Sequence, residues 1–171
     1  MNVVYAFAIS ASVIASITTL AFLSFPGLLI WCAFIGWAAY LQSGGIASVI
    51  SSVSASMLFG AFMAWLFAVI LSMGVLPFGV PVAAALIVAV MAPIMVIAQK
   101  IGLLSVVPAT FYGFASSFAF LAQTDGVFNL DSLLSLSLAN SLIIVPVSLF
   151  IGVFLGWLHA TAAGMLTQQA G

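Results

Sequence analysis

The residues of this chain best suited to chemistry are hydroxyls within an apolar stretch, Leu104 to Ala122, with the sequence LSVVPATFYGFASSFAFLA. A helix that only had to face lipid would need neither hydroxyls nor a proline. We therefore expect a short or broken helix at membrane depth whose backbone and hydroxyl groups line a path for a solute. The groups concerned are Ser105, Pro108, Thr110, Tyr112, Ser116 and Ser117.

Two further sources of polar groups lie elsewhere in the chain. Ser48, Ser51, Ser52 and Ser56 follow helical spacing, so one helix face is expected to present most of them. Asn140 is expected in the middle of a membrane helix, where its amide offers both a donor and an acceptor. Its alternative role is a hydrogen bond that joins two helices.

Enzyme chemistry has little support in the sequence. The ionisable side chains that matter are Lys100, Asp125, Asp131 and His159. A hydrolase triad needs a base held by a third group, and a metal site needs several ligands at short spacing. Neither pattern is present, so we expect no enzyme, no metal and no cofactor. His159 is expected at the membrane interface, and Cys32 in the apolar core.

Ion-coupled transport is disfavoured for a related reason. Coupling to protons or sodium usually requires a carboxylate within the membrane, and both aspartates are expected in a loop. Hydroxyls, an amide and aromatic rings suit a neutral polar solute whose hydrogen bonds must be replaced inside a pore. The expected path residues are Pro108, Thr110, Tyr112, Ser116, Ser117, Ser48, Ser52, Asn140 and Phe111.

Composition sets the fold class. Of the 171 residues, 67% are hydrophobic and 2% charged, and the mean hydropathy is +1.49. A soluble domain would have nothing polar to show water, so we expect an all-α integral membrane protein in contact with the lipid bilayer. The chain is expected to form a single transmembrane domain over residues 1–171, multi-pass in a bacterial inner membrane. It has no basic patch for nucleic acid.

The expected fold has five or six membrane segments, of which one or two are short, broken or re-entrant. A straight crossing takes roughly 20 apolar residues, and the second segment is shorter than that. The predicted segments are Val3–Leu23, Leu28–Leu41, Ile46–Met73, Val82–Ala98, Leu104–Ala122 and Ser132–His159.

The spacing of helix-breaking residues suggests an internal repeat. Pro26 and Pro108 are 82 positions apart, and so are Gly44 and Gly126. The same order of predicted segments, one membrane span, one short segment and one long span, then occurs twice, over residues 1–75 and 82–160. If each copy crosses the membrane an odd number of times, the second copy is inverted relative to the first.

Two stretches resemble a bacterial inner-membrane family of unsettled activity, the YcdZ-like proteins. They are LLIWCAFIGWAAYLQSGG, which begins at Leu28, and LLSVVPATFYGFASSFA, which begins at Leu103. This resemblance implies the inner membrane. Val-Pro-Ala-Thr-Phe, from Val107, is more weakly similar to a Leu-Pro-Ala-Leu-Thr-type box of bacterial urea transporters. That similarity implies one half of a protein built from two inverted copies.

The leading hypothesis is a passive channel or facilitator for a small neutral, urea-like solute. One alternative is a non-transporting membrane subunit or scaffold. Another is a transporter of an amphipathic or aromatic molecule, with Trp31, Phe111, Tyr112 and Phe118 as a stacking pocket. A homo-oligomer, dimer or trimer, is expected because so small a chain gives little room for an enclosed pore. With Lys100 as the one basic residue, insertion in both orientations, or orientation by partners, is expected.

Overall fold

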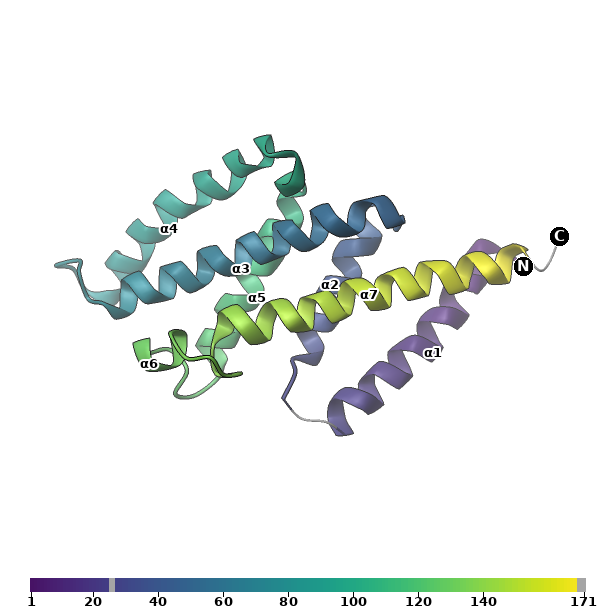
Figure 1. Ribbon diagram of the computed structural model, residues 1–171, viewed down its shortest axis with the longest axis horizontal. Coiled ribbons are helices and arrows are strands. Elements are labelled where there is room, and N and C mark those ends of the chain that lie inside the picture. The colour runs from purple at the N-terminus through teal and green to yellow at the C-terminus, as the bar shows by residue number, and fades with distance from the viewer. Residues whose placement is uncertain (25–26, 169–171) are drawn as a thin grey trace. The chain divides into compact units, whose positions relative to one another are not determined.

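The computed structural model describes residues 1–24 and 27–168, and in these ranges the regular structure is helical (Figure 1). A 3₁₀ turn, Ala47–Val49, leads directly into α3. Two more such turns, Ala98–Lys100 and Gly102–Leu104, join α4 to α5. The α-helices are α1 Val3–Ser24, α2 Ile30–Gln42, α3 Ile50–Ser72, α4 Val80–Ile97, α5 Val107–Gln123, α6 Leu130–Leu133 and α7 Ser141–Gln168.

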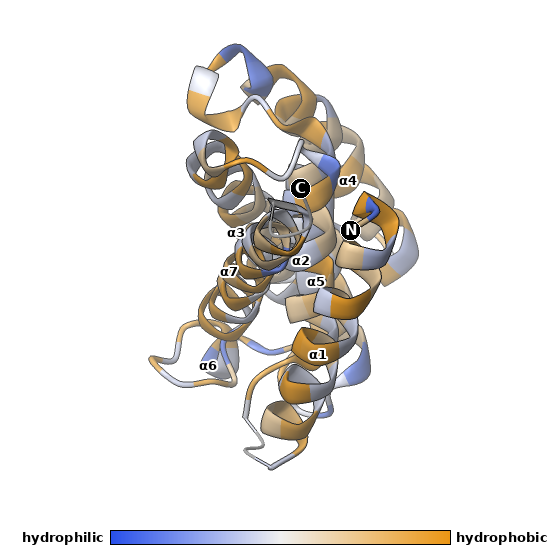
Figure 2. Ribbon diagram, turned by 90° about the vertical axis from the view of Figure 1, so that its right-hand side faces the viewer, coloured by the Kyte–Doolittle hydropathy of each residue, from blue (hydrophilic) through white to orange (hydrophobic). Residues whose placement is uncertain are grey.

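The expected class, an all-α integral membrane protein, is confirmed. Four helical stretches are long and apolar enough to cross a bilayer: Val3–Ser24, Ala47–Ser72, Val80–Lys100 and Ser141–Thr167. Large apolar side chains point outward from them, such as Leu20, which is 70% exposed. Figure 2 shows hydrophobic residues along the helices and hydrophilic ones mainly at turns and ends. These outward faces are therefore the surface that meets lipid.

The expected short helices are also present. α2 has 13 residues and α5 has 17, which correspond to lengths of about 20 and 26 Å at 1.5 Å per residue. The turn glycines Gly44 and Gly126 have φ values of 110° and 73°, in the left-handed region that glycine adopts without steric cost. Pro26, which served as the other marker of the repeat, lies outside the described residues.

Two expectations about individual elements were wrong. The segment predicted from Ser132 to His159 is not one helix, because α6 ends at Leu133 and α7 starts only at Ser141. Between them, Ser135 bonds the Ser132 carbonyl oxygen and the Ser137 hydroxyl, and such local side-chain bonds compete with helix formation. The serine set does not share one face either. Ser48 lies in the 3₁₀ turn and is exposed, as is Ser51, whereas Ser56 is buried.

The chain forms two compact units, and the first comprises Met1–Ile50 and Ser148–Gly171. It contains α1, α2 and most of α7. A Cβ atom added to Gly36 of α2 would collide with the Leu149 carbonyl oxygen, and one on Gly152 of α7 with the carbonyl oxygen of Ala33. Further along both helices, a Cβ on Gly156 would press on Tyr40. The two backbones therefore touch and run in the same direction.

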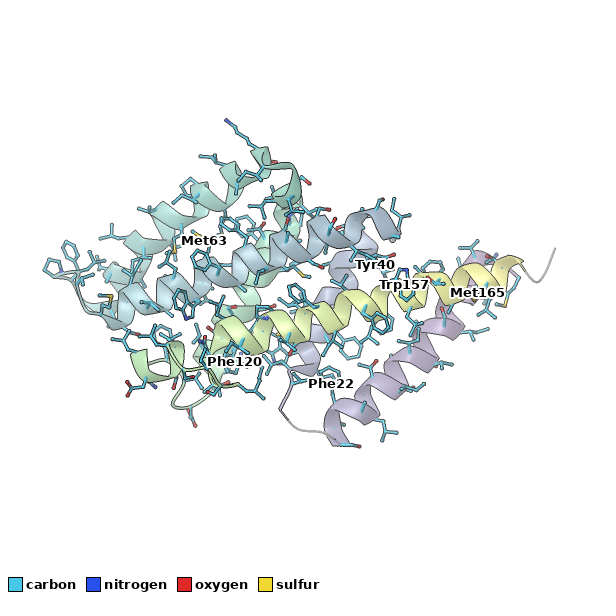
Figure 3. The ribbon with its side chains drawn as sticks, in the orientation of Figure 1. Phe22, Tyr40, Met63, Phe120, Trp157 and Met165 are labelled. Atoms are coloured by element: carbon cyan, nitrogen blue, oxygen red, sulfur yellow. The ribbon has the colours of Figure 1, made fainter. Side chains whose placement is uncertain are left out.

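The second unit comprises Ser51–Val147 and contains α3 to α6 with the start of α7. A Cβ on Gly60 of α3 would collide with the Thr110 carbonyl oxygen, and one on Gly113 of α5 with that of Met57. Later in both helices, the rings of Phe67 and Phe118 pack with centroids 4.6 Å apart. α3 and α5 are thus also parallel and in backbone contact. The core of this unit includes the buried side chains Met63 and Phe120 (Figure 3).

Candidate functional site

Three of the predicted path residues lie together on the buried face of α5. Pro108 stands in the first turn of this helix, where its missing N–H removes no hydrogen bond. From there Thr110, Gly113 and Ser117 follow at intervals of three and four residues, so they share one face, and Ser116 flanks Ser117. Thr110, Ser116 and Ser117 are each 0% exposed. The helix that the sequence singled out therefore carries three fully buried hydroxyls, and their place on a solute path stays a prediction.

The hydroxyls on this face have no hydrogen-bond partner among the described residues. This holds for Thr110, Ser116 and Ser117 of α5 and for Ser56 of α3, which is also 0% exposed. A helical serine usually bonds the carbonyl oxygen one turn earlier, as Ser10 does with Ala6 at 2.9 Å. Leaving a buried hydroxyl unpaired costs about 1–3 kcal/mol. With Ser72 and Ser141, whose buried hydroxyls also have no partner in the described part of the chain, six such groups lie in the second unit, which is an unusual feature.

The glycine crossing brings Ser56 of α3 and Thr110 of α5 to the same contact, and Ser116 and Ser117 follow one to two turns further along α5. Thr110 faces Gly60 through its carbonyl oxygen, and Ser56 directly precedes Met57, whose carbonyl oxygen faces Gly113. Because α3 and α5 are parallel, Ser56 and Thr110 both lie on the N-terminal side of the crossing. We define the hydroxyl cluster as Ser56, Thr110, Ser116 and Ser117. It is a buried set of donors and acceptors suited to a small polar molecule.

The remaining predicted path residues lie in other surroundings. Pro108 and Phe111 are exposed on the outer side of α5, with Phe111 39% exposed, and Tyr112 is half-buried. Ser52 is half-buried in α3, and Ser48 is exposed. Ser56 joins the cluster although the short list of path residues did not contain it. Its signal in the sequence is its position four residues before Gly60, on the face that makes the crossing.

Asn140 is not a mid-helix amide, as the sequence had suggested. It directly precedes α7, where its Oδ1 accepts the N–H of Leu142 at 2.9 Å. Its Nδ2 donates to the Ser135 carbonyl oxygen, also at 2.9 Å. Such bonds satisfy backbone groups that a helix start leaves unpaired. Its role on a solute path stays a prediction, with both ends of the amide already bonded within the protein.

His159 is buried, at 5% exposure, so its ring faces neighbouring helices, and its expected depth at the membrane interface stays a prediction. The indole N–H of Trp37 donates to His159 Nδ1 at 3.0 Å, and Nε2 lies 3.0 Å from the Phe7 carbonyl oxygen. Because Nδ1 accepts, Nε2 carries the proton and donates to Phe7. Phe7 belongs to α1, Trp37 to α2 and His159 to α7. Three helices of the first unit therefore meet at this imidazole, which hydropathy alone could not reveal.

Each unit has an apolar groove on its surface, and the second unit also has a partly polar groove beside Ser72, Asn129 and Asp131. In the second unit a groove of about 470 Å³ lies among Ala55, Leu58, Phe59, Phe62, Leu104 and Leu142. In the first, one of about 330 Å³ lies between α1 and the end of α7. Neither apolar groove contains a predicted path residue. Of the suggested stacking pocket, Phe118 is half-buried and packs on Phe67 and Phe114. No group of three or more potential metal ligands comes together in the described ranges.

Comparison with known proteins gives one match. The model of the family DUF1097, described as a protein of unknown function, matches residues 8–164. No curated protein and no solved structure matches the chain. The resemblance to a membrane family without settled activity agrees with this match. The narrower likeness to YcdZ-like proteins and to urea transporters gains no support from these comparisons.

Proposed function

The chain belongs to the DUF1097 family, whose function is unknown, and we propose that it is a passive facilitator for a small neutral polar solute. The proposed location is a bacterial inner membrane, where the chain acts as a dimer or trimer. The observation that carries the proposal is the hydroxyl cluster, four fully buried side chains without a partner among the described residues.

The physical argument concerns the state of these hydroxyls. Serine and threonine are common where membrane helices pack, but their hydroxyls then normally bond the helix backbone or a neighbouring helix. Four unpaired hydroxyls instead offer replacement hydrogen bonds to a solute that has left water. Without such bonds, each polar group of the solute would cost roughly 2–7 kcal/mol in an apolar medium. The cluster therefore supports permeation better than packing.

The charge distribution favours a neutral solute. Lys100, Asp125 and Asp131 are the charged side chains of the sequence; Lys100 stands at the end of the stretch Val80–Lys100, and both aspartates lie outside the four stretches that can cross a bilayer. An ion crossing among uncharged helices would meet neither a counter-charge nor a coupling carboxylate. A neutral molecule needs only donors and acceptors. Passive flux down a gradient is the mode that fits this inventory.

The test is flux into liposomes that contain the purified protein, measured for urea, glycerol, ammonia and water. We expect at least one solute to enter faster than in protein-free vesicles. Thr110→Val keeps the side-chain shape and removes the hydroxyl, and we expect it to reduce that flux about five- to tenfold, as one lost hydrogen bond of about 1 kcal/mol implies. Thr161→Val is the matched control, because the Thr161 hydroxyl lies in α7 and already bonds the Trp157 carbonyl oxygen at 2.8 Å.

A non-transporting membrane subunit is the second candidate, and the apolar groove on the surface of each unit favours it. Such a protein would show no flux of any of the four solutes and would co-purify with a membrane partner in fixed ratio. If vesicles with and without protein take up every solute at the same rate, the facilitator proposal is wrong and this candidate takes its place.

A further inference from the structure

Helices of the first unit correspond position by position to helices of the second. α1 begins at Val3 and α4 at Val80, and α2 begins at Ile30 and α5 at Val107, a shift of 77 in both cases. The buried positions shift equally: Ala6, Ser10, Ile14 and Thr18 of α1 correspond to Ala83, Ile87, Met91 and Met95 of α4. The crossing glycines Gly36 and Gly113 obey the same shift.

α3 and α7 correspond as well, at a shift of 92. From Ser56 and from Ser148 the sequence reads Ser, three residues, Gly, one residue, Phe, two residues, Trp-Leu, one residue, Ala. In each unit the glycine of this motif, Gly60 or Gly152, makes the parallel crossing with the short helix. The larger shift arises because α6 and its flanking turns stand between α5 and α7.

We propose that the chain is a duplicated three-helix unit whose two copies have diverged, so that Ser56 and the start of α5 bind the solute while Ser148 and the start of α2 bind each other. The first copy is α1, α2 and α3, and the second is α4, α5 and α7. Each compact unit contains the third helix of the other copy. These shifts replace the spacing of 82 that turn residues alone had suggested.

The polar groups at matching positions show the divergence. In the first unit the Leu29 N–H, just before α2, donates to Ser148 Oγ at 3.0 Å. The matching residues of the second unit are Val106 and Ser56, and Ser56 Oγ has no partner among the described residues. The unpaired hydroxyls of α5 also have no hydroxyl counterpart of the same kind in α2. At the shift of 77, Thr110 matches Ala33, Ser116 matches Ala39 and Ser117 matches Tyr40.

These differences define the chemistry of the solute. The first backbone N–H groups of α5 have no carbonyl partner within the helix and are therefore available as donors. No side chain caps them. Ser56 and Thr110 add hydroxyls that both donate and accept. The matching solute is a small neutral molecule with an acceptor oxygen and a polar hydrogen, as in amides, ureas and alcohols. This inference rests on the proposed function, and it adds Ser56 as a residue that selects the solute.

Two matched variants test the divergence without any transport measurement. Ser148→Ala removes the acceptor of the Leu29 N–H, so we expect the unfolding temperature in detergent to fall by about 2–4 °C. Ser56→Ala removes an unpaired buried hydroxyl, so we expect that temperature to stay unchanged or to rise. An equal fall in both variants would show that Ser56 is bonded within the protein, and the inference would then be wrong.

Flux measurements complete the test. We expect Ser56→Ala to lower urea flux into liposomes about five- to tenfold, and Ser148→Ala to leave it near that of the unmodified protein. Equal losses in both variants would overturn the inference but leave the facilitator proposal intact. Absence of flux in the unmodified protein would instead overturn the facilitator proposal. Formate is the anionic probe: entry of formate without urea would contradict the assigned solute class.

Discussion

The indole N–H of Trp37 donates a hydrogen bond to Nδ1 of His159 across 3.0 Å, between helices that are far apart in the sequence. The two rings meet edge to face, with centroids 5.2 Å apart, and the other nitrogen of the imidazole reaches the Phe7 carbonyl oxygen. Because no water competes within an apolar bundle, these bonds fix how α1, α2 and α7 pack.

Replacement of His159 should therefore loosen the first unit. His159→Phe introduces the residue found at the matching position of the second unit, Phe67, and leaves the Trp37 N–H unpaired. We expect a loss of about 1–3 kcal/mol in unfolding free energy, measured by denaturation in detergent. Trp37→Phe and the double variant complete a cycle. If the two single losses simply add, the hydrogen bond contributes nothing of its own.

The glycine crossings should tolerate no side chain. Gly113→Ala places a methyl group against the Met57 carbonyl oxygen, so α3 and α5 must separate, at a cost of about 1–3 kcal/mol or more. Gly164→Ala is the control within α7, because its added methyl meets nothing within 4 Å. It should leave stability unchanged or raise it by up to about 1 kcal/mol. Thermal unfolding of both variants checks the prediction, and equal effects would contradict the close contact.

Substitutions of Asn140 distinguish a role in capping α7 from a role on the solute path. Asn140→Ala removes the bonds to Leu142 and Ser135, and we expect about 1–2 kcal/mol of lost stability. Asn140→Ser keeps a capping oxygen and should recover most of that loss. Hydrogen exchange of the first turn of α7 is the measurement. If Asn140→Ser folds normally yet reduces solute flux as strongly as Thr110→Val, the amide acts on the path after all.

The two parallel crossings carry a prediction about membrane topology. If the short helices α2 and α5 also cross the membrane, the chain crosses six times, and α2 must run with α7 and α3 with α5, as the contacts within each unit show. Both ends of the chain and the turn at Lys100 should then lie on one side, and residues 73–79 and Asp125 on the other. In a chain inserted one way only, the positive-inside rule would place the Lys100 side in the cytoplasm, whereas dual insertion would place it on both sides. Cysteine labelling at these sites checks it, and labelling of one site from both sides would show dual insertion.

Composition and spacing determined the class of this protein and the bounds of most of its helices. A chain with 2% charged residues cannot cover a water-facing surface, so its membrane location follows from the sum of its residues. The same local reasoning singled out α5, whose hydroxyls at Thr110, Ser116 and Ser117 are fully buried, and it predicted short helices between long ones. These properties depend on neighbours in the sequence, which is why the sequence sufficed.

The tertiary structure decided which polar groups are unpaired. Thr110 and Ser56 have unpaired hydroxyls because two glycines bring α3 and α5 into backbone contact, whereas Asn140 and His159 are bonded within the protein. Hydropathy assigns Ser56 and Ser148 the same value, yet only Ser148 lies against a backbone N–H that bonds it. Hydrogen bonds between distant segments depend on distances of a few ångströms, and these exist only once the helices have packed.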